Sequence, residues 1–344
     1  MKISVVIPTV RRVEMLRSAL KSVEAQSNLS VIAEIIVSEN SLDTQSQSIP
    51  GEFPNLPIRY FQQAPPLSVE NHFVKLIEMA ASPWVAMIGD DDMWGRYHLE
   101  EACRSLAQVS EAIAYVAQCV MVENESRQAR NGYTPLLSAY GGPLSSELRP
   151  YWIWNAREML FESLFRTPLN IWGLVARKTC LLESMEFMRG GKLGLDSDRY
   201  MFWRLSLLGK ILVGRETSLY YRVHLNSGCQ LLAREDPGFH DDQARQFTEM
   251  MLDEAENQGI PWDQDWMKFW DGLNKRERDD IWFTSALAGA QFALVSRLKK
   301  KRAEFGYPTQ KARALLMLVS CMPPILLPLL NRVWRLGRSV CSKS

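Results

Sequence analysis

The sequence lacks the cysteine pattern of a zinc site. Its six cysteines are scattered, and no two are spaced as Cys-x-x-Cys. Counting alone leaves a disulfide framework open, although reduced, buried thiols are favoured in a chain of 344 residues. The sequence also shows no internal repeat and no low-complexity tract, so an ordinary globular composition with a sizeable core is expected.

The N-terminus lacks both a long apolar run and a glycine-rich loop. Residues 3–7 form a short apolar stretch that Pro8 ends, too short for a secretory signal peptide, so a cytosolic body is expected. Residues 8–12 contain no glycine. A sugar nucleotidyltransferase, one candidate class of enzyme, usually has a glycine-rich phosphate loop near its N-terminus, so this absence disfavours that class.

An excess of basic residues occurs only near the C-terminus. Residues 297–344 carry 11 Lys or Arg and one acidic residue, whereas the whole chain carries 40 basic and 39 acidic residues. Residues 1–296 are therefore net acidic, which disfavours a nucleic-acid-binding body because such binding needs a basic face. We expect a soluble acidic body with a basic tail that meets something anionic.

Short β-branched runs alternate with helical patterns in the first part of the chain. Strands are expected at residues 3–7, 33–38, 58–61 and 84–88, and helices at residues 12–26 and 69–79. This alternation is typical of an α/β fold with a mostly parallel sheet flanked by helices. The loops that follow parallel strands meet at one edge of the sheet, where ligands bind.

Three consecutive carboxylates, Asp90, Asp91 and Asp92, follow the strand expected at residues 84–88. Their charges repel one another, so holding them together without a cation is costly. Oxygen-rich clusters suit Mg²⁺ or Mn²⁺, which commonly bridge one or two carboxylates to substrate phosphates. The alternative is a solvated acidic turn that caps the next helix. The preceding buried strand and the loops expected beside it favour a metal site.

The loop after the first strand is expected at the same edge of the sheet. Pro8 and Thr9 end that strand, and the chain then enters a helix whose first N–H groups attract anions. Arg11 and Arg12 stand at this turn, and arginine pairs readily with phosphate. The loop therefore suits a nucleotide diphosphate, although the pattern by itself is weak.

The loop after the second strand contains Glu39 and Asn40. A carboxylate at a strand end can accept a nucleobase N–H, and the neighbouring amide can donate to a base carbonyl. The alternative is a plain Asx-type turn. Asn71 and Lys75 precede the aspartate strand and can approach the same ligand, although Lys75 is more simply a solvated helix residue.

Five segments occur in an informative order. They are Val5-Val6-Ile7-Pro8-Thr9, then Val37-Ser38-Glu39-Asn40-Ser41-Leu42-Asp43, then Gly89-Asp90-Asp91-Asp92, then Leu195-Asp196-Ser197-Asp198 with Trp203-Arg204-Leu205 and Gly209-Lys210-Ile211, and finally Tyr221-Arg222-Val223-His224. Together they resemble glycosyltransferase family 2, with its GT-A fold, over residues 1–225. Three positions depart from the family pattern. Glu39 stands where Asp is commoner, Gly89 where the first Asp of Asp-x-Asp-Asp is usual, and Ser197 where an acidic residue is usual.

The resemblance implies an inverting transfer of a sugar from a nucleotide-diphosphate sugar to an acceptor hydroxyl. Mn²⁺ or Mg²⁺ would be held by Asp90, Asp91 and Asp92, with Asp91 favoured, and His224 would lie at the metal or diphosphate, unless it is a structural histidine. The implied donor-binding residues are Pro8, Thr9, Arg11, Arg12, Glu39, Asn40, Asn71 and Asp90.

The acceptor side has a carboxylate as catalytic base in the family that the chain resembles. Asp198 occupies that position, with Asp196 as the second choice. The local sequence by itself favours another role for Asp198, as the N-cap of a helix over residues 199–207.

The resemblance and the pattern together divide the chain into two regions. Residues 1–240 are expected to form a GT-A domain, with a nucleotide-sugar-binding half at 1–125 and an acceptor half at 126–240. Within it, residues 132–150 read as a long loop. Residues 241–344 are expected to form a helical C-terminal region that ends in a basic, apolar, membrane-associating tail.

The tail combines cationic residues with an apolar run. Residues 299–302 are Lys-Lys-Lys-Arg, and residues 314–330 are nearly all apolar but include three prolines. About 20 apolar residues are needed to span a bilayer as a helix, so an interfacial or re-entrant anchor is favoured, with a helix packed in the core as the alternative. Such an anchor predicts a peripheral protein on the cytoplasmic face of the cell membrane and a lipid-linked saccharide acceptor, as in bacterial surface polysaccharide assembly.

One non-enzymatic alternative stays open. Gly89 and Ser197 occupy positions that are usually acidic in the family that the chain resembles. The chain is therefore also compatible with a catalytically degenerate, membrane-recruited nucleotide-sugar-binding protein. The sequence does not identify the sugar, the base, the acceptor, the linkage or the oligomeric state.

Overall fold

The structure is a computed structural model that describes residues 1–123, 129–131, 149–164, 169–189, 197–224, 227, 237–266 and 297. The chain forms two compact units. The first contains Met1–Glu162, Thr167–Leu193 and Met201–Ser227, and the second contains Ser163–Arg166, Gly194–Tyr200 and Gly228–Ser344. The domain boundaries expected from the sequence stay a prediction. Residues 132–148 of the expected loop and the apolar run at 314–330 lie outside the described residues.

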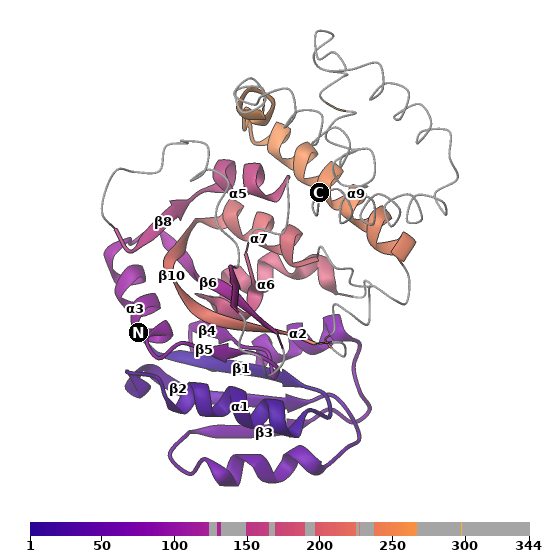
Figure 1. Ribbon diagram of the computed structural model, residues 1–344. Helices are drawn as coiled ribbons and strands as arrows, with labels where there is room; N and C mark the ends of the chain where they lie inside the picture. Colours follow the sequence, from indigo (N-terminus) through magenta and orange to yellow (C-terminus); the bar gives the residue numbers. More distant parts are fainter. Residues whose placement is uncertain are drawn as a thin grey trace, which may run out of the picture. The chain divides into compact units, whose positions relative to one another are not determined.

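A ten-stranded sheet organises the first unit (Figure 1). Its strands are β1 (Ile3–Thr9), β2 (Ile32–Glu39), β3 (Ile58–Gln62), β4 (Trp84–Met87), β5 (Met93–Trp94), β6 (Ala112–Glu123), β7 (Ala129–Asn131), β8 (Tyr151–Trp154), β9 (Leu174–Arg177) and β10 (Lys210–Val223). Their order is β3-β2-β1-β4-β9-β6-β10-β5, with β7 beside β6 and β8 beside β10. The α/β fold class expected from the sequence is confirmed.

The parallel arrangement belongs to one part of the sheet. Strand β1 pairs in parallel with β2 and β4, and β2 pairs in parallel with β3. Beyond β4 the sheet is mixed, because β9 runs antiparallel to both β4 and β6, whereas β6 and β10 are parallel. The expectation of a mostly parallel sheet therefore describes the N-terminal four strands. Short antiparallel strands such as β5 need no crossover helix and leave little periodicity in the sequence.

Helices cover both faces of this sheet. They are α1 (Val13–Glu24), α2 (Val69–Met79), α3 (His98–Gln108), α5 (Ala156–Ser163), α6 (Lys178–Ser184) and α7 (Ser197–Leu208), with short 3₁₀ helices at Leu29–Val31, Gln45–Glu52, Ile171–Gly173 and Glu186–Met188. Helices α1 and α3 pack into one hydrophobic core, and α2, α5, α6 and α7 contribute to the core on the other face. Strand β1 supplies both cores, because Val5 and Val6 point to opposite faces and both are fully buried.

The amphipathic pattern of α1 explains how it docks on the sheet. Its buried residues, Leu16, Ala19, Leu20 and Val23, recur at helical spacing and form one stripe. The opposite face carries charged residues, including Arg17, which pairs with Glu52. Docking of this stripe places the start of α1 next to the end of β1, at the edge of the sheet where the expected loops lie.

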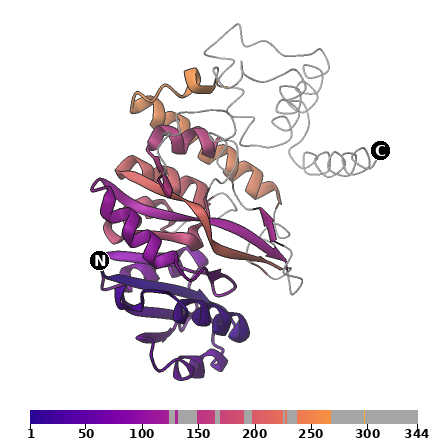
Figure 2. The same ribbon diagram turned by 60° about the vertical axis from the view of Figure 1, so that its left-hand side comes forward.

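The long strand β10 connects distant parts of the first unit. Figure 2 shows β6 and β10 running side by side, and their pairing extends from Lys210 to Val223 with several irregularities in register. Near its end, Leu219 and Tyr220 pair with the two residues of β5. Because β5 directly follows the three aspartates, β10 carries residues 222–224 to the aspartate cluster.

The second unit contains α9 (Pro237–Asn257). Arg199, whose side chain is buried, donates to the carbonyl oxygens of Ser163 and Ala244 at 3.0 and 2.9 Å. The helical pattern expected from Asp241 onward is confirmed as far as Asn257. In the described part of the chain, the helices are too short or too polar to traverse a bilayer.

Candidate active site at the ends of β1, β2 and β4

The ends of β1 and β4 are joined by a hydrogen bond between side chains. The two strands are parallel neighbours, so the residues that follow them lie at the same edge of the sheet. The Thr9 hydroxyl donates to Asp90 Oδ2 at 2.7 Å, and the Val10 backbone N–H lies 3.4 Å from the same oxygen. The first loop and the aspartate turn, which the sequence placed at one edge, do meet there.

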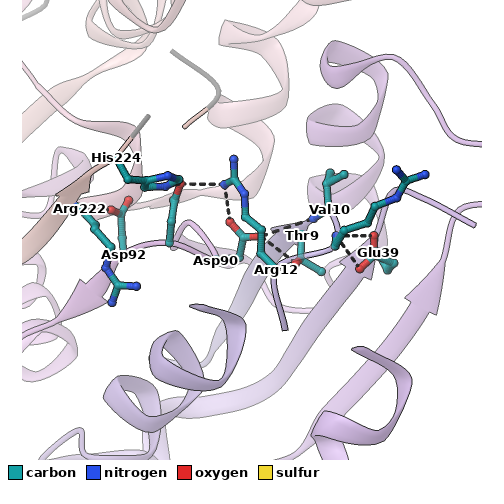
Figure 3. Close-up of polar contacts among 10 residues, drawn as sticks. Thr9, Val10, Arg12, Glu39, Asp90, Asp92, Arg222 and His224 are labelled. Carbon is teal, nitrogen blue, oxygen red and sulfur yellow. Dashed lines mark hydrogen bonds and ion pairs between the residues drawn. The ribbon is translucent and has the colours of Figure 1, made fainter. Parts of the chain in front are cut away.

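Arg12 links the same loop to two of the three aspartates. Its Nη1 donates to Asp90 Oδ1 at 3.0 Å, as Figure 3 shows, and to Asp91 Oδ2 at 2.7 Å. Burial lowers the pKa of Arg12, but the charges of Asp90 and Asp91 outweigh burial and leave that pKa raised. Burial raises the pKa of Asp90 to about 6 even though Arg12 opposes this change. The guanidinium of Arg12 therefore lies between carboxylates in a place with little access to water.

Residues at the end of β10 complete the cluster. His224 Nε2 lies 3.0 Å from Asp91 Oδ2, and the Arg222 backbone N–H donates to Asp92 Oδ1 at 2.9 Å. Figure 3 shows both residues on the side of Asp90 that faces away from Thr9 and Glu39. His224, expected from the sequence near the metal or diphosphate, therefore contacts the carboxylate that was favoured as the metal ligand.

Asp92 has one carboxylate oxygen without a hydrogen bond. The side chain is fully buried, and Oδ2 has no partner among the described residues. Burial and the charge of Asp91 raise the pKa of Asp92 well above its usual value. An unpaired buried carboxylate oxygen is costly, and a cation is one group that would offset this cost.

Because Gly89 has no side chain, two carboxylates can extend into the space beside it. A Cβ at this position would lie 2.9 Å from Asp91 Oδ1 and 3.0 Å from Asp92 Oδ2. Both oxygens therefore border the same small volume, which any other side chain at Gly89 would fill. The residue that departs from the family pattern is the one that allows this approach.

The donor set fits a divalent cation that also binds a ligand. Within the described ranges, no three His, Cys, Asp or Glu side chains lie together as a complete metal-binding group. Two hard carboxylate oxygens, from Asp91 and Asp92, nevertheless converge at Gly89. Mg²⁺ and similar ions are usually held by one or two carboxylates, with substrate phosphates and water as the other ligands. The residues are compatible with such a cation, and the metal site expected at the aspartates stays a prediction.

Glu39, at the end of β2, is buried, and both of its carboxylate oxygens accept hydrogen bonds from neighbouring residues. Its two oxygens accept the backbone N–H of Arg11 at 3.2 and 3.3 Å. The hydroxyl of Ser41 donates to Oε1 at 2.7 Å, and that of Ser46 to Oε2 at 2.6 Å. The base-reading role expected for Glu39 stays a prediction, and the carboxylate is bound to the two neighbouring loops.

Asn40 forms a clamp within the same edge of the sheet. Its Nδ2 donates to the Leu67 carbonyl at 2.9 Å, and its Oδ1 accepts the Leu67 N–H at 2.8 Å. Asn71 and Lys75 are exposed on α2, where the Asn71 N–H donates to the N-cap Ser68 at 3.3 Å. The nucleotide-binding roles expected for Asn40 and Asn71 stay predictions.

The two acceptor-side candidates belong to the second unit. Asp198 lies in the first turn of α7, and its Oδ1 accepts the Arg199 N–H at 3.0 Å. The helix begins at Ser197 rather than at the expected residue 199. Asp196 lies outside the described residues. The catalytic role of Asp198 therefore stays a prediction.

Sequence reasoning did not single out several residues that shape the site. Ser41 and Ser46 orient Glu39 through their hydroxyls, and Arg222 binds Asp92 through its backbone. A signal existed for Arg222, because it belongs to the Tyr-Arg-x-His segment. A hydroxyl seven residues after Glu39 leaves no comparable signal.

Comparison with known proteins gives a family match in the N-terminal part of the chain. Residues 4–167 match the family model described as "Glycosyl transferase family 2". A search of curated protein sequences finds no match.

Solved structures of S. aureus TarS resemble the fold of this chain. The crystal structure of TarS 1–349 in complex with UDP-GlcNAc has a TM-score of 0.53 at 13% identity, covering 72% of this chain and 66% of that chain. The structure of TarS 1–349 has a TM-score of 0.51, and its complex with UDP has 0.50, each at 15% identity over 72% of this chain and 64% of that chain. The matches thus span slightly less than two thirds of those chains.

The geometry and the comparisons agree on one assignment. The fold is of the GT-A type, as the sequence resemblance implied, with the aspartate turn at the carboxyl end of β4. The family model covers all three loops that meet at this edge. Residues 4–167 of the chain therefore match glycosyl transferase family 2, and the fold around them resembles that of the TarS structures.

Proposed function

We propose that the protein transfers a sugar from a nucleoside-diphosphate sugar to an acceptor hydroxyl, with inversion at the anomeric carbon. The observation that carries this proposal is the junction of the β1 and β4 ends, where Thr9 and Arg12 contact the aspartates within a family 2 domain. The likeness to a TarS structure in complex with UDP-GlcNAc supports a UDP-sugar as the first donor to test.

The diphosphate would lie at the start of α1, beside Arg12. Among the described residues, no side chain forms a capping hydrogen bond at the start of this helix, and the N-terminus of a helix favours anions. Arg12 supplies a positive charge at the same place. We expect Arg12 to exchange part of its contact with Asp90 and Asp91 for the diphosphate, because guanidinium binds phosphate as readily as it binds carboxylate.

Asp91 and Asp92 would hold Mn²⁺ or Mg²⁺ together with the diphosphate. The unpaired Oδ2 of Asp92 and its approach to Asp91 Oδ1 beside Gly89 support this assignment. The cation, when bound, stabilises the charge that develops on the diphosphate leaving group. His224 would orient Asp91 through their 3.0 Å contact.

Asp198 would act as the general base. In the transfer, its carboxylate accepts the proton of the acceptor hydroxyl, the hydroxyl oxygen bonds to the anomeric carbon, and the bond from that carbon to the diphosphate breaks. A base of this kind typically contributes ~10²–10⁴-fold to the rate. Direct displacement at one centre inverts the configuration. The basic tail supports a lipid-linked acceptor at the cytoplasmic face of the membrane as the acceptor to test first.

A donor screen tests the proposal. The full chain is mixed with UDP-GlcNAc, UDP-glucose, UDP-galactose and GDP-mannose, with MnCl₂ or with EDTA, and its melting temperature and the release of nucleotide are measured. A donor that binds only the folded protein raises the melting temperature. We expect one donor to do so with MnCl₂, and Asp91→Asn to abolish both the shift and the release.

The controls separate the enzyme from its alternative. Asp242→Asn, which removes an exposed carboxylate paired with Arg245, should leave binding and release unchanged. Asp198→Asn should retain donor binding and lose transfer. Gly89 keeps a catalytically degenerate binding protein as the second candidate, and donor binding without any transfer or hydrolysis would favour it. If no nucleotide sugar binds under any condition, the proposed function is wrong.

A further inference from the structure

The carboxylate of Glu39 has no hydrogen-bonding capacity left for a ligand. A carboxylate offers about four acceptor positions, two on each oxygen. Oε1 accepts from the Arg11 N–H and the Ser41 hydroxyl, and Oε2 accepts from the Arg11 N–H and the Ser46 hydroxyl. The side chain is 0% exposed. A nucleobase N–H would have to displace one of these partners to reach Glu39.

The partner shared by both oxygens lies at an unusual backbone position. Arg11 has a φ of 55°, in the left-handed region that residues other than glycine rarely adopt. Its backbone N–H points at Glu39, and this double contact holds the residue in that conformation. The Arg11 side chain itself is exposed, so the backbone of Arg11 is what Glu39 fixes.

The left-handed turn decides where the next side chain points. Arg12 directly follows the turn and reaches Asp90 and Asp91 at 3.0 and 2.7 Å, whereas Thr9 directly precedes it and donates to Asp90. Figure 3 shows Glu39 on one side of Thr9 and Val10, and Asp90 on the other. A change in the backbone at Arg11 would therefore move Arg12 relative to both aspartates.

We propose that Glu39 is a positioning residue for the diphosphate site rather than a reader of the nucleobase. It holds Arg11 in the left-handed conformation and thereby aims Arg12 at the place where the diphosphate and its cation bind. The inference rests on the proposed function and deepens it, because it assigns Glu39 to phosphate binding.

Inorganic pyrophosphate tests this role because it has no base. Its affinity for the full chain is measured by calorimetry with MnCl₂ for the wild type and for Glu39→Gln, whose amide cannot accept at both positions. We expect a loss of about tenfold, the size that a single well-placed hydrogen bond produces. A residue that contacts only the base would weaken UDP binding and leave pyrophosphate binding unchanged, and that result would overturn the inference.

A matched control separates positioning from a general loss of stability. Glu34 is a second buried carboxylate on β2, at the opposite end of the strand, where it accepts from Ser4, Arg59 and the Ala81 N–H. Glu34→Gln removes a comparable network far from the loop. We expect it to lower the melting temperature as Glu39→Gln does, with pyrophosphate affinity within about twofold of the wild type. An equal loss of affinity in both variants would contradict the proposal.

A double-mutant cycle with Arg11→Gly identifies the mechanism. Glycine adopts a φ of 55° without steric cost, so in its presence the turn depends less on Glu39. We expect Glu39→Gln to cost about tenfold in the wild-type background and less than about threefold in the Arg11→Gly background. A loss of the same size in both backgrounds would overturn the positioning role. Wild-type protein that binds neither pyrophosphate nor UDP would instead overturn the proposed function, and this inference with it.

Discussion

At the scale of single residues, Asp92 carries the clearest unbalanced charge of the site. It is fully buried, one oxygen has no hydrogen bond in the described part of the chain, and Asp91 adds a repelling charge. Without a cation, this arrangement is held against its own electrostatics by the Arg222 N–H and by the surrounding fold. The same features that destabilise the cation-free protein make the place attractive to a cation.

Asp92→Asn is expected to separate these two effects. The substitution removes a buried charge and keeps an oxygen for the Arg222 N–H, so the free energy of unfolding in EDTA should rise by about 1–3 kcal/mol. The increase in melting temperature on addition of MnCl₂ should disappear at the same time. Urea denaturation in EDTA measures the first effect and thermal denaturation the second. A less stable protein in EDTA, or an undiminished response to MnCl₂, would argue against this account of Asp92.

His98 gives a residue-scale prediction that concerns pH. Burial lowers the pKa of this histidine to about 3, its Nδ1 lies 3.2 Å from the Ser218 hydroxyl, and its ring packs against Trp94 at 4.5 Å. The unfolded chain has an ordinary histidine pKa, so between about pH 6.5 and 3 unfolding takes up a proton. The stability that neutral His98 allows is therefore complete above pH 6.5 and falls as the pH decreases.

His98→Asn is expected to flatten this dependence. The amide stays neutral at every pH and can still meet Ser218. Each histidine that titrates only on unfolding contributes about 1.4 kcal/mol per pH unit, so the wild type should lose about 2 kcal/mol more than the variant between pH 7 and 5. Urea denaturation at the two pH values gives both differences. Parallel losses in the two proteins would show that His98 is not responsible.

At the scale of elements, Asn40 joins the end of β2 to the connection between β3 and α2. Its amide forms two hydrogen bonds with the backbone of Leu67, and that connection then leads to Ser68, the N-cap of α2. The clamp therefore fixes the position of α2 relative to β2, as well as the loop next to Glu39.

Asn40→Ala removes both hydrogen bonds and leaves two backbone groups of Leu67 without these partners. We expect the free energy of unfolding to fall by about 1–3 kcal/mol. Asn40→Asp keeps the acceptor but places an oxygen opposite the Leu67 carbonyl, so it should be destabilised as well. Urea denaturation measures the two losses, and Ser48→Ala, at an exposed position of the 3₁₀ helix Gln45–Glu52, serves as the control. A stability equal to that of the wild type would refute the clamp.

The elements that the sequence predicts best are those with a strong local period. Strands β1, β2 and β4 and helices α1 and α2 lie where their apolar patterns indicate, and α2 begins and ends at the expected residues. From these elements follows the meeting of the first loop and the aspartate turn, because parallel neighbours end at one edge. No single segment of the sequence, however, indicates that β1 pairs with β4.

What the sequence did not predict depends on pairs of residues far apart in the chain. The antiparallel insertion of β9 between β4 and β6 has no local signature, since four residues fit either direction. The contact between Arg222 and Asp92 joins positions 130 residues apart. The hydrogen bonds that Glu39 accepts from Arg11, Ser41 and Ser46 depend on the left-handed conformation of Arg11. Because Arg11 is not a glycine, the sequence does not indicate that conformation.

At the scale of the whole molecule, charge divides the chain. Residues 297–344 hold 11 of its 40 basic residues and one of its 39 acidic residues. The family 2 match ends at residue 167, so neither that family nor the aspartate cluster accounts for this segment. A basic segment next to an apolar run is suited to an anionic membrane surface, where each basic side chain is worth about 1 kcal/mol.

Neutralising residues 299–302 should therefore weaken membrane binding without affecting the donor site. In the variant with Lys299, Lys300, Lys301 and Arg302 all replaced by Gln, up to about 4 kcal/mol of attraction is lost, which corresponds to roughly 10³-fold in affinity. Cosedimentation of the full chain with vesicles of phosphatidylglycerol and phosphatidylcholine measures the change, and vesicles of phosphatidylcholine alone are the control. Attraction of this kind also weakens as salt is added. If the wild type does not bind anionic vesicles although it binds the donor, residues 297–344 do not bind the membrane. A soluble acceptor is then the one to test.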